Sequence, residues 1–344
     1  MTYIVPGVSV AGGSVELASH AALPPFRPRF PWIGADMQTL RNSLARVRTP
    51  AAHHKAAPLT VPLYGGKYGA LTVAQDHPSG GAAGKALVLC HGLGGCSNSA
   101  YMLETTCFFL GLGYSVFRIN MRGSGLSKST APAPYSGGLT SDYRAVLSAI
   151  DPVHYRHGLY LMGFSLGGQL MVRALGETDI RVPVKAAVSV SAPLDLSTAS
   201  RKLEQTRNRP YQRYLVNNMN RDLAHLLPDF EANPPRSVRD YDNRLIAPFM
   251  GFDGAEAYYH GVSCLHRLEE VSVPLMAVHS CDDPWIPAED YSRAPWPKNT
   301  VALLTDGGGH VGFHSRGLPS PWHNHAAHNF FDCISRKNIN QLSV

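Results

Sequence analysis

The residues Gly163-Phe-Ser-Leu-Gly-Gly168 follow directly on the apolar run Gly158-Leu-Tyr-Leu-Met162. They form the pattern G-x-S-x-G, in which a strand ends, the chain turns sharply and a helix begins beneath the serine. Such a turn holds Ser165 in a strained backbone conformation that presents its Oγ above the sheet. Gly163 and Gly167 are expected because a Cβ at either position would clash across so tight a turn. We interpret Ser165 as a nucleophile; the alternative is an idle serine on a structural strand–helix turn.

Short apolar strands alternate with helical segments on both sides of this turn. Strands are predicted over 86–90, 115–119, 159–162, 184–190, 275–278 and 300–304, and helices over 101–110, 141–150 and 324–334. Residues 59–63 and 70–73 are predicted to pair as a hairpin. The alternation is typical of βαβ units and predicts a mainly parallel sheet that helices cover on both faces.

The alternation divides the chain into three parts. Residues 1–30 are rich in Gly, Ala and Pro and are expected to form a loose N-terminal arm. Residues 31–195 and 271–344 are expected to form the core. Residues 196–270 contain helical patches without a clear strand, so we interpret them as a helical lid above the carboxyl ends of the strands. The alternative is a set of ordinary surface helices.

Seven large apolar side chains of the predicted lid fit two different roles. Such side chains are typical of a hydrophobic acyl pocket and equally of packing between lid helices. The seven residues are Tyr211, Tyr214, Leu215, Met219, Phe249, Met250 and Phe252.

A serine hydroxyl needs a base, and the base needs an acid that orients it. In a fold of this kind the chain order is Ser, then Asp or Glu, then His in a loop after the last strand. His310 fits this position, because it follows the predicted strand 300–304 within Gly307-Gly-Gly-His-Val-Gly-Phe313. The chain has 16 histidines, but only His310 combines a strand end, a glycine-rich loop and the right place in the order.

The acid is expected in His279-Ser-Cys-Asp-Asp-Pro-Trp-Ile-Pro287, directly after the predicted strand 275–278. Two aspartates compete for the role. We favour Asp283 because Pro287 follows it by four residues, and we expect Asp282 to cap or brace the loop. The alternative is that both aspartates only form a turn before the proline.

A tetrahedral intermediate at Ser165 would carry a negative oxygen that needs fixed donors. One expected donor is the backbone N–H of Leu166, directly after the serine. The second is the N–H of Leu93 in the segment His91-Gly-Leu-Gly-Gly95, where glycines such as Gly92 allow close approach to an ester. A phosphate-binding loop is the rival interpretation, but neither a Gly-Lys-Ser/Thr sequence nor G-x-G-x-x-G is present.

Bulk composition narrows the class of protein. The chain has 344 residues, of which 44% are hydrophobic and only 16% charged, which is typical of a folded domain. The net charge of +6 is spread without a basic cluster, so we expect no nucleic-acid partner and at most weak contact with an anionic membrane surface. The cysteine spacings fit no zinc site, and we expect reduced thiols and neither metal nor organic cofactor.

The sequence predicts neither a signal peptide nor a membrane-spanning segment. The N-terminal residues lack a basic segment followed by a long apolar one, and no apolar stretch reaches about 18 residues. A cytoplasmic location is the resulting expectation.

The chain resembles the YheT-type α/β-hydrolases, which are grouped with the mammalian ABHD lipid hydrolases, over roughly residues 25–335. The matching segments are Phe26-Arg-Pro-Arg-Phe-Pro-Trp32, Gln38-Thr39-Leu40, His91-Gly-Leu-Gly-Gly95, Asn120-Met-Arg-Gly-Ser-Gly125, Gly163-Phe-Ser-Leu-Gly-Gly168, Ser191-Ala-Pro-Leu-Asp195, Tyr258-Tyr259, Asp282-Asp-Pro284 and Gly308-Gly-His-Val-Gly-Phe313. The family usually has a histidine just before the Gln-Thr pair, where this chain has Asp36-Met37.

The resemblance implies an α/β-hydrolase fold, with a mostly parallel sheet, flanking helices and a helical lid. It also implies esterase- or lipase-like activity, and that Arg122 braces the floor of the active site. The family's natural substrates are mostly undefined, so the resemblance names none.

The residues therefore predict a serine carboxylic-ester hydrolase that acts on short- to medium-chain acyl esters through an acyl-enzyme. An acyltransferase or a lipid-active lipase or phospholipase with the same three residues is an alternative. A non-catalytic binding protein on the same scaffold is another alternative, but it would be favoured by a missing member of the Ser-Asp-His set. The acyl length, the alcohol and the oligomeric state are not encoded in any recognised pattern.

Overall fold

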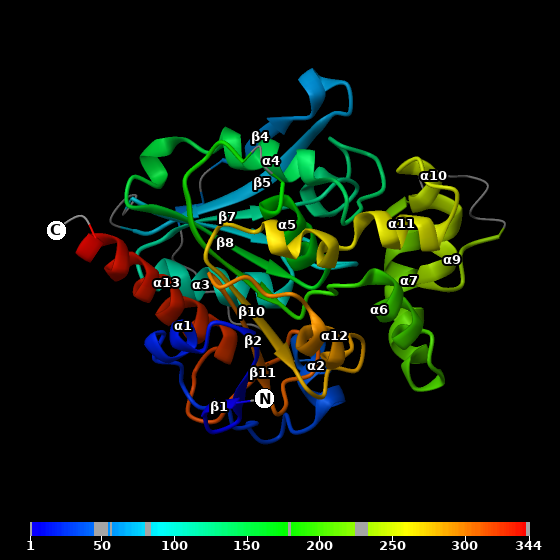
Figure 1. Ribbon diagram of the computed structural model, residues 1–344. Helices are drawn as coiled ribbons and strands as arrows, with labels where there is room; N and C mark the ends of the chain where they lie inside the picture. The colour runs from blue at the N-terminus through cyan, green and yellow to red at the C-terminus, as the bar shows by residue number, and fades with distance from the viewer. Residues whose placement is uncertain are drawn as a thin grey trace.

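A single twisted sheet runs through the centre of the molecule (Figure 1). The computed structural model describes residues 2–44, 54–55, 57–79, 84–177, 180–223 and 233–341. The sheet has 11 strands, and the path through it is β1-β2-β11-β10-β9-β8-β6-β7-β5-β3, with β4 paired to β5. Their bounds are β1 Thr2–Val5, β2 Val8–Gly13, β3 His54–Lys55, β4 Leu59–Pro62, β5 Ala70–His77, β6 Lys85–Cys90, β7 Ser115–Ile119, β8 Gly158–Phe164, β9 Val184–Val190, β10 Leu275–Ser280 and β11 Thr300–Thr305.

The six strands from β6 to β11 are parallel, and the strands that flank them, β2 beside β11 and β5 beside β7, are antiparallel to them. The prediction of a mainly parallel sheet is therefore confirmed, as is the hairpin of β4 and β5. All residues of β7, β8, β10 and β11 are buried, which explains why these strands are almost continuously apolar rather than alternating.

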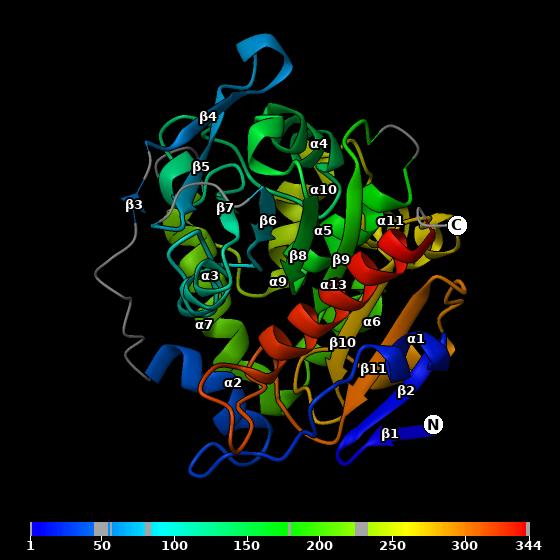
Figure 2. The same cartoon turned by 90° about the vertical axis from the view of Figure 1, so that its left-hand side faces the viewer.

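Helices cover both faces of the sheet. Figure 2 shows α13 and α3 crossing the same face, and side chains of α1, α3 and α13 form one apolar core with that face. Helices α4, α5 and α12 pack with the opposite face in a second core. The bounds of these helices are α1 Val15–His20, α3 Ala100–Gly111, α4 Thr140–Ala149, α5 Leu166–Leu175, α12 Ala288–Arg293 and α13 Trp322–Gln341, and the short α2 spans Ala35–Leu44.

Where the structure describes the segment 196–270, over 196–223 and 233–270, it consists of helices joined by short turns and loops and contains no strand. Its helices lie together beside the sheet (Figure 1), and their buried side chains form a third apolar cluster. They are α6 Leu196–Leu203, α7 Arg209–Leu223, α9 Val238–Tyr241, α10 Ala247–Phe249 and α11 Ala255–Val262, with a π-helical turn over Asp242–Ile246. Whether this segment acts as a lid stays a prediction.

The expectation of a loose arm over residues 1–30 is wrong. Strand β2 pairs antiparallel with β11, and Val8 is fully buried in the core on the α13 side. Phe26 makes edge-to-face contacts with Phe313 and Trp322. The physical reason is that β11 would otherwise be an unpaired edge of the parallel sheet, and β2 covers it.

This finding predicts that the N-terminal strand contributes to stability. Val8→Ala removes two methyl groups from a fully buried position, so we expect a loss of about 2 kcal/mol in the free energy of unfolding. Val15→Ala is the matched control, because Val15 is 44% exposed and its truncation is expected to cost less than about 0.5 kcal/mol. Urea unfolding measures both. Equal stabilities of the two variants would show that β2 is only loosely attached.

Candidate active site

Ser165 is the single residue between strand β8 and helix α5. Its backbone has φ 50° and ψ −124°, which is a strained conformation for a residue with a side chain. A Cβ on Gly163 would lie 2.6 Å from Gly167 O, and a Cβ on Gly167 would lie 2.3 Å from His91 O. This crowding is why both positions hold glycine, and it fixes the serine where the strand ends and the helix starts.

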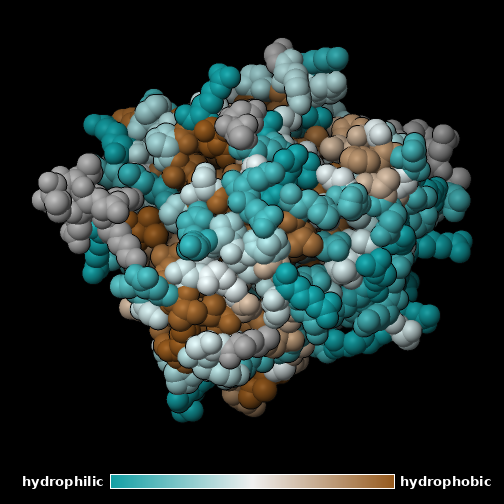
Figure 3. Space-filling model, viewed as in Figure 1, coloured by the Kyte–Doolittle hydropathy of each residue, from teal (hydrophilic) through white to brown (hydrophobic). Residues whose placement is uncertain are grey.

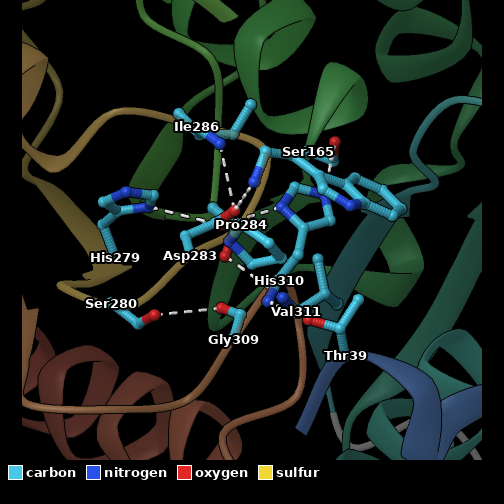
Figure 4. Close-up of polar contacts among 12 residues, drawn as sticks. Thr39, Ser165, His279, Ser280, Asp283, Pro284, Ile286, Gly309, His310 and Val311 are labelled. Carbon is cyan, nitrogen blue, oxygen red and sulfur yellow. Dashed lines mark hydrogen bonds and ion pairs between the residues drawn. The ribbon is translucent and has the colours of Figure 1, made fainter. Parts of the chain in front are cut away.

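A continuous line of hydrogen bonds connects Asp283, His310 and Ser165 (Figure 4). His310 Nδ1 lies 2.8 Å from Asp283 Oδ2, and His310 Nε2 lies 2.9 Å from Ser165 Oγ. The three residues come from the ends of β10, β11 and β8, so the sheet brings together residues up to 145 positions apart. His310 and Asp283 are almost completely buried, at 5% and 2% exposure.

The surroundings of Asp283 keep it ionised. Burial acts to raise the pKa of this carboxyl, but His310, by its charge and its hydrogen bond, lowers the pKa below the ordinary value of Asp. Asp283 Oδ1 accepts hydrogen bonds from the N–H groups of Trp285 and Ile286, at 2.8 and 3.0 Å. The Trp285 ring lies against the imidazole of His310, with ring centroids 4.2 Å apart. These contacts fix both the charge of the acid and the plane of the imidazole.

Asp282 points to a different partner. Its Oδ1 accepts hydrogen bonds from the Ser280 hydroxyl at 2.7 Å and from the Gly309 N–H at 2.8 Å. Asp282 thus ties the end of β10 to the glycine loop before His310, while Asp283 contacts the imidazole itself. The Asp282 carboxylate therefore binds the loop, and the Asp283 carboxylate binds the imidazole ring.

Helix α2 also binds the loop that carries His310. The sequence patterns did not predict this contact. Thr39 Oγ1 accepts a hydrogen bond from the His310 N–H at 2.8 Å. Gln38 exchanges two hydrogen bonds with the backbone of His314, at 2.7 and 3.0 Å. A Cβ on Gly309 would lie 2.3 Å from Ala35 O, so only glycine permits this approach. The one available signal was the Gln38-Thr39-Leu40 segment, which matched the family without an assigned role.

The residues that carry the two expected backbone donors, Leu93 and Leu166, line the same cavity as Ser165. Leu166 is the first residue of α5, so its N–H precedes the intrahelical bonds. The Leu93 N–H donates no hydrogen bond among the described residues. The loop that carries it is fixed by bonds from the Gly92 N–H to the Tyr101 hydroxyl and from the Gly94 N–H to the Tyr135 hydroxyl. Gly92 packs so closely that a Cβ there would lie 2.9 Å from the Cβ of Ser165.

Arg122 lies away from this line of hydrogen bonds. Its guanidinium makes two bonds to the Asp142 carboxylate, at 2.5 and 2.6 Å, and both residues are buried. The neighbouring Met121 N–H donates to His91 Nε2 at 3.2 Å. Arg122 therefore joins the loop after β7 to α4, and the same loop supports the segment that carries Leu93.

Ser165 opens into a mainly apolar cavity of about 100 Å³ between the sheet and the 196–270 helices. Leu93 and Leu166 line the cavity together with the serine, and side chains from α6, α7, α9, the π-helical turn and α11 form much of the remaining wall. Such a cavity, next to a serine that contacts a buried histidine, suits the attack of the serine on a carbonyl carbon of an apolar molecule.

Among the described residues, no group of three or more His, Cys, Asp or Glu side chains is arranged to hold a metal ion. Each of the six cysteines has a free thiol: Cys90, Cys96, Cys107, Cys264, Cys281 and Cys333. Within the described ranges, none of the helices is both long enough and apolar enough to cross a bilayer.

Comparison with known proteins agrees with this architecture. The model of the alpha/beta hydrolase family matches residues 87–318. The solved structure of the esterase Pf2001 of Pyrococcus furiosus superimposes with a TM-score of 0.54 over 83% of this chain and 92% of that protein, at 15% identity. An identity this low supports the fold alone.

Two curated relatives are similar in sequence. The monoacylglycerol lipase of Saccharomyces cerevisiae is 32% identical over 249 residues, which cover 66% of this chain and 54% of the relative. The chain thus spans about half the length of the yeast protein. The putative esterase YheT of Escherichia coli is 30% identical over 240 residues, which cover 66% of this chain and 70% of YheT. The family model covers more than half of the chain and includes the strand–Ser165–helix turn, and YheT is 30% identical. The chain therefore belongs to the alpha/beta hydrolase family, among its YheT-like members.

Proposed function

We propose that the protein is a serine carboxylic-ester hydrolase whose catalytic residues are Ser165, His310 and Asp283. The observation that carries the proposal is the unbroken line of hydrogen bonds from Asp283 through His310 to Ser165 Oγ, at the mouth of an apolar cavity. The names of the curated relatives, a monoacylglycerol lipase and a putative esterase, support ester hydrolysis as the reaction class.

In the first half of the reaction, Ser165 Oγ attacks the acyl carbon while His310 Nε2 takes the hydroxyl proton. The negative oxygen that develops accepts hydrogen bonds from the N–H groups of Leu93 and Leu166. Asp283 stabilises the imidazolium and holds its Nδ1–H in place. His310 then protonates the leaving alcohol, and the acyl group remains on Ser165. In the second half, His310 takes a proton from water, which attacks the acyl carbon. The bond from that carbon to Ser165 Oγ then breaks, the carboxylic acid leaves, and His310 returns the proton to Oγ.

The size of the cavity favours short- to medium-chain acyl groups. An apolar cavity of about 150 Å³ in another protein accommodates benzene, so a space of about 100 Å³ fits a chain of a few carbons without rearrangement. The helices over 196–270 roof this space, and we propose that they act as a lid. We propose that the substrate is a dissolved small-molecule ester and that the reaction needs no cofactor and no nucleic-acid partner. A cytoplasmic location is part of the same proposal.

The relatives also support one alternative, a lipid-active lipase, since one of them is named for monoacylglycerol. The face in Figure 3 carries separate apolar patches among hydrophilic side chains. Phe30, Ile33 and Leu44 are more than half exposed, and the basic residues Arg27 and Arg29 precede Phe30 in the chain, which favours the weak contact with anionic membranes expected from the net charge. An acyltransferase would use the same residues with an alcohol in place of water.

Ser165→Ala is expected to lower kcat for ester hydrolysis by at least about a thousand-fold, because the nucleophile is lost. A fluorophosphonate probe should label the wild-type protein and leave the variant unlabelled. Circular dichroism and thermal unfolding control for the fold. A variant that retains the wild-type rate would exclude the serine mechanism, and a wild-type protein that neither reacts with the probe nor cleaves esters would favour a binding protein.

Asp283→Asn is expected to reduce kcat by up to about 10⁴-fold, because the amide would hold the His310 ring in the wrong tautomer. Asp282→Asn is the matched control, since it changes an adjacent carboxylate that contacts the loop and not the imidazole. Its loss should be far smaller. The assignment of the acid is reversed if Asp282→Asn proves to be the more damaging change in steady-state kinetics.

Activity should be higher on butyrate and octanoate esters of p-nitrophenol than on the palmitate ester, because the cavity is small. Initial rates across this series, measured below and above the critical micelle concentration of each ester, test the point. A maximum at palmitate, with a jump in rate once micelles form, would identify an interfacial lipase instead. Added alcohol that diverts product from acid to ester would reveal acyl transfer.

A further inference from the structure

One wall of the apolar cavity carries a carboxyl group that the proposed reaction does not use. Asp242 lines the cavity together with Ser165, although it belongs to the helical segment that roofs it. It begins the π-helical turn over Asp242–Ile246, a type of irregularity that is frequent at functional sites. Only 9% of the residue is exposed, and its neighbours around the cavity include Leu203, Val238 and Ile246.

The hydrogen bonding of this carboxyl is incomplete. Asp242 Oδ2 accepts a bond from the Tyr259 hydroxyl at 2.7 Å. In the described part of the chain, Oδ1 has no hydrogen-bond partner and no cation pairs with the group. Burial raises the pKa of Asp242 to about 7, against the opposing effect of the Tyr259 bond. Near neutral pH the group is therefore present in both forms, and its free oxygen can accept or donate a hydrogen bond.

A second polar side chain, Ser200, also lines the cavity. Ser200 is 7% exposed, and its side chain interacts with the Tyr259 hydroxyl, the group that donates to Asp242. Buried polar groups are almost always satisfied, so the incomplete Asp242 carboxyl beside a mainly apolar space indicates a polar atom of the ligand.

We propose that the segment of the substrate that fills this cavity carries a hydroxyl group, which hydrogen bonds to Asp242. This inference rests on the proposed ester hydrolysis and names its substrate class, a hydroxylated ester. A hydroxyl suits the wall because it both donates and accepts while adding no charge to an apolar space. A terminal carboxylate would be repelled by ionised Asp242, and an ammonium group would lose its hydration with a single counter-ion in return.

Matched esters test the proposal. p-Nitrophenyl 6-hydroxyhexanoate and p-nitrophenyl heptanoate differ only by a hydroxyl in place of a methyl group, and shorter and longer pairs vary the reach. At the length that reaches Asp242, the wild-type protein should prefer the hydroxylated ester by about ten-fold or more in kcat/KM. Hydroxyalkyl acetates, paired with alkyl acetates, show whether the hydroxyl belongs to the alcohol part instead.

Variants of Asp242 separate recognition from a structural role. Asp242→Leu should abolish the preference while it keeps activity on the methyl analogue, and Asp242→Asn should retain a reduced preference because an amide still hydrogen bonds. Asp253→Leu is the control, an exposed aspartate in the same helical segment. If Asp242 only ties the segment to Tyr259, both esters slow equally in Asp242→Leu and the ratio stays at its wild-type value, which overturns the proposal.

Binding to Ser165→Ala, measured by calorimetry with the same ester pairs, makes the test independent of turnover. Tighter binding of the hydroxylated member supports the inference, and equal affinities overturn it. Ser165-dependent hydrolysis without any hydroxyl preference would leave the proposed function standing and remove only the inference. Absence of ester hydrolysis in the wild-type protein would remove the proposed function.

Discussion

The close packing around Ser165 is the constraint on which the site depends. The serine is held at φ 50° only because Gly163, Gly167 and Gly92 let three backbone segments approach within distances that a Cβ would forbid. A strained turn persists when its surroundings determine it fully, and here the ends of β6 and β8 and the start of α5 supply those surroundings. Any substitution that separates these segments would also separate Ser165 from Leu93. The geometry of Ser165 and of the segment that carries Leu93 is therefore set by one structural unit.

The other part of the site is the loop that carries His310. His310 belongs to a loop that Asp282 holds from β10 and Thr39 holds from the N-terminal segment. Helix α2 thus takes part in placing the imidazole, and β2 pairs with β11, the strand that leads into this loop. The N-terminal part of the chain secures the position of a side chain about 270 residues away.

These two halves differ in how well the sequence reveals them. The strand–serine–helix turn, the glycines before His310 and the Asp-Asp-Pro segment are local patterns, and local sterics give them a recognisable spacing. The bond between Thr39 and His310 joins residues 271 positions apart, and no period or motif marks it. Strand β2 was missed because Val8-Ser-Val-Ala-Gly-Gly is short and ends in glycines, and its pairing with β11 depends on the rest of the sheet. The role of Asp242 was hidden similarly, since burial in an apolar cavity is a property of the folded helices.

Two buried aspartates show how the fold gives one residue type opposite properties. Both carboxyls are removed from water, which disfavours the charged form. At Asp283 the imidazole of His310 and two backbone N–H groups offset that cost, and the pKa falls below its ordinary value. At Asp242 a single tyrosine hydroxyl does not offset it, and the pKa rises to about 7. The first carboxyl is thereby a fixed negative charge behind His310. The second can change its protonation near neutral pH, and because it lines the cavity that Ser165 opens into, a bound molecule that hydrogen bonds to it would also shift its ionisation.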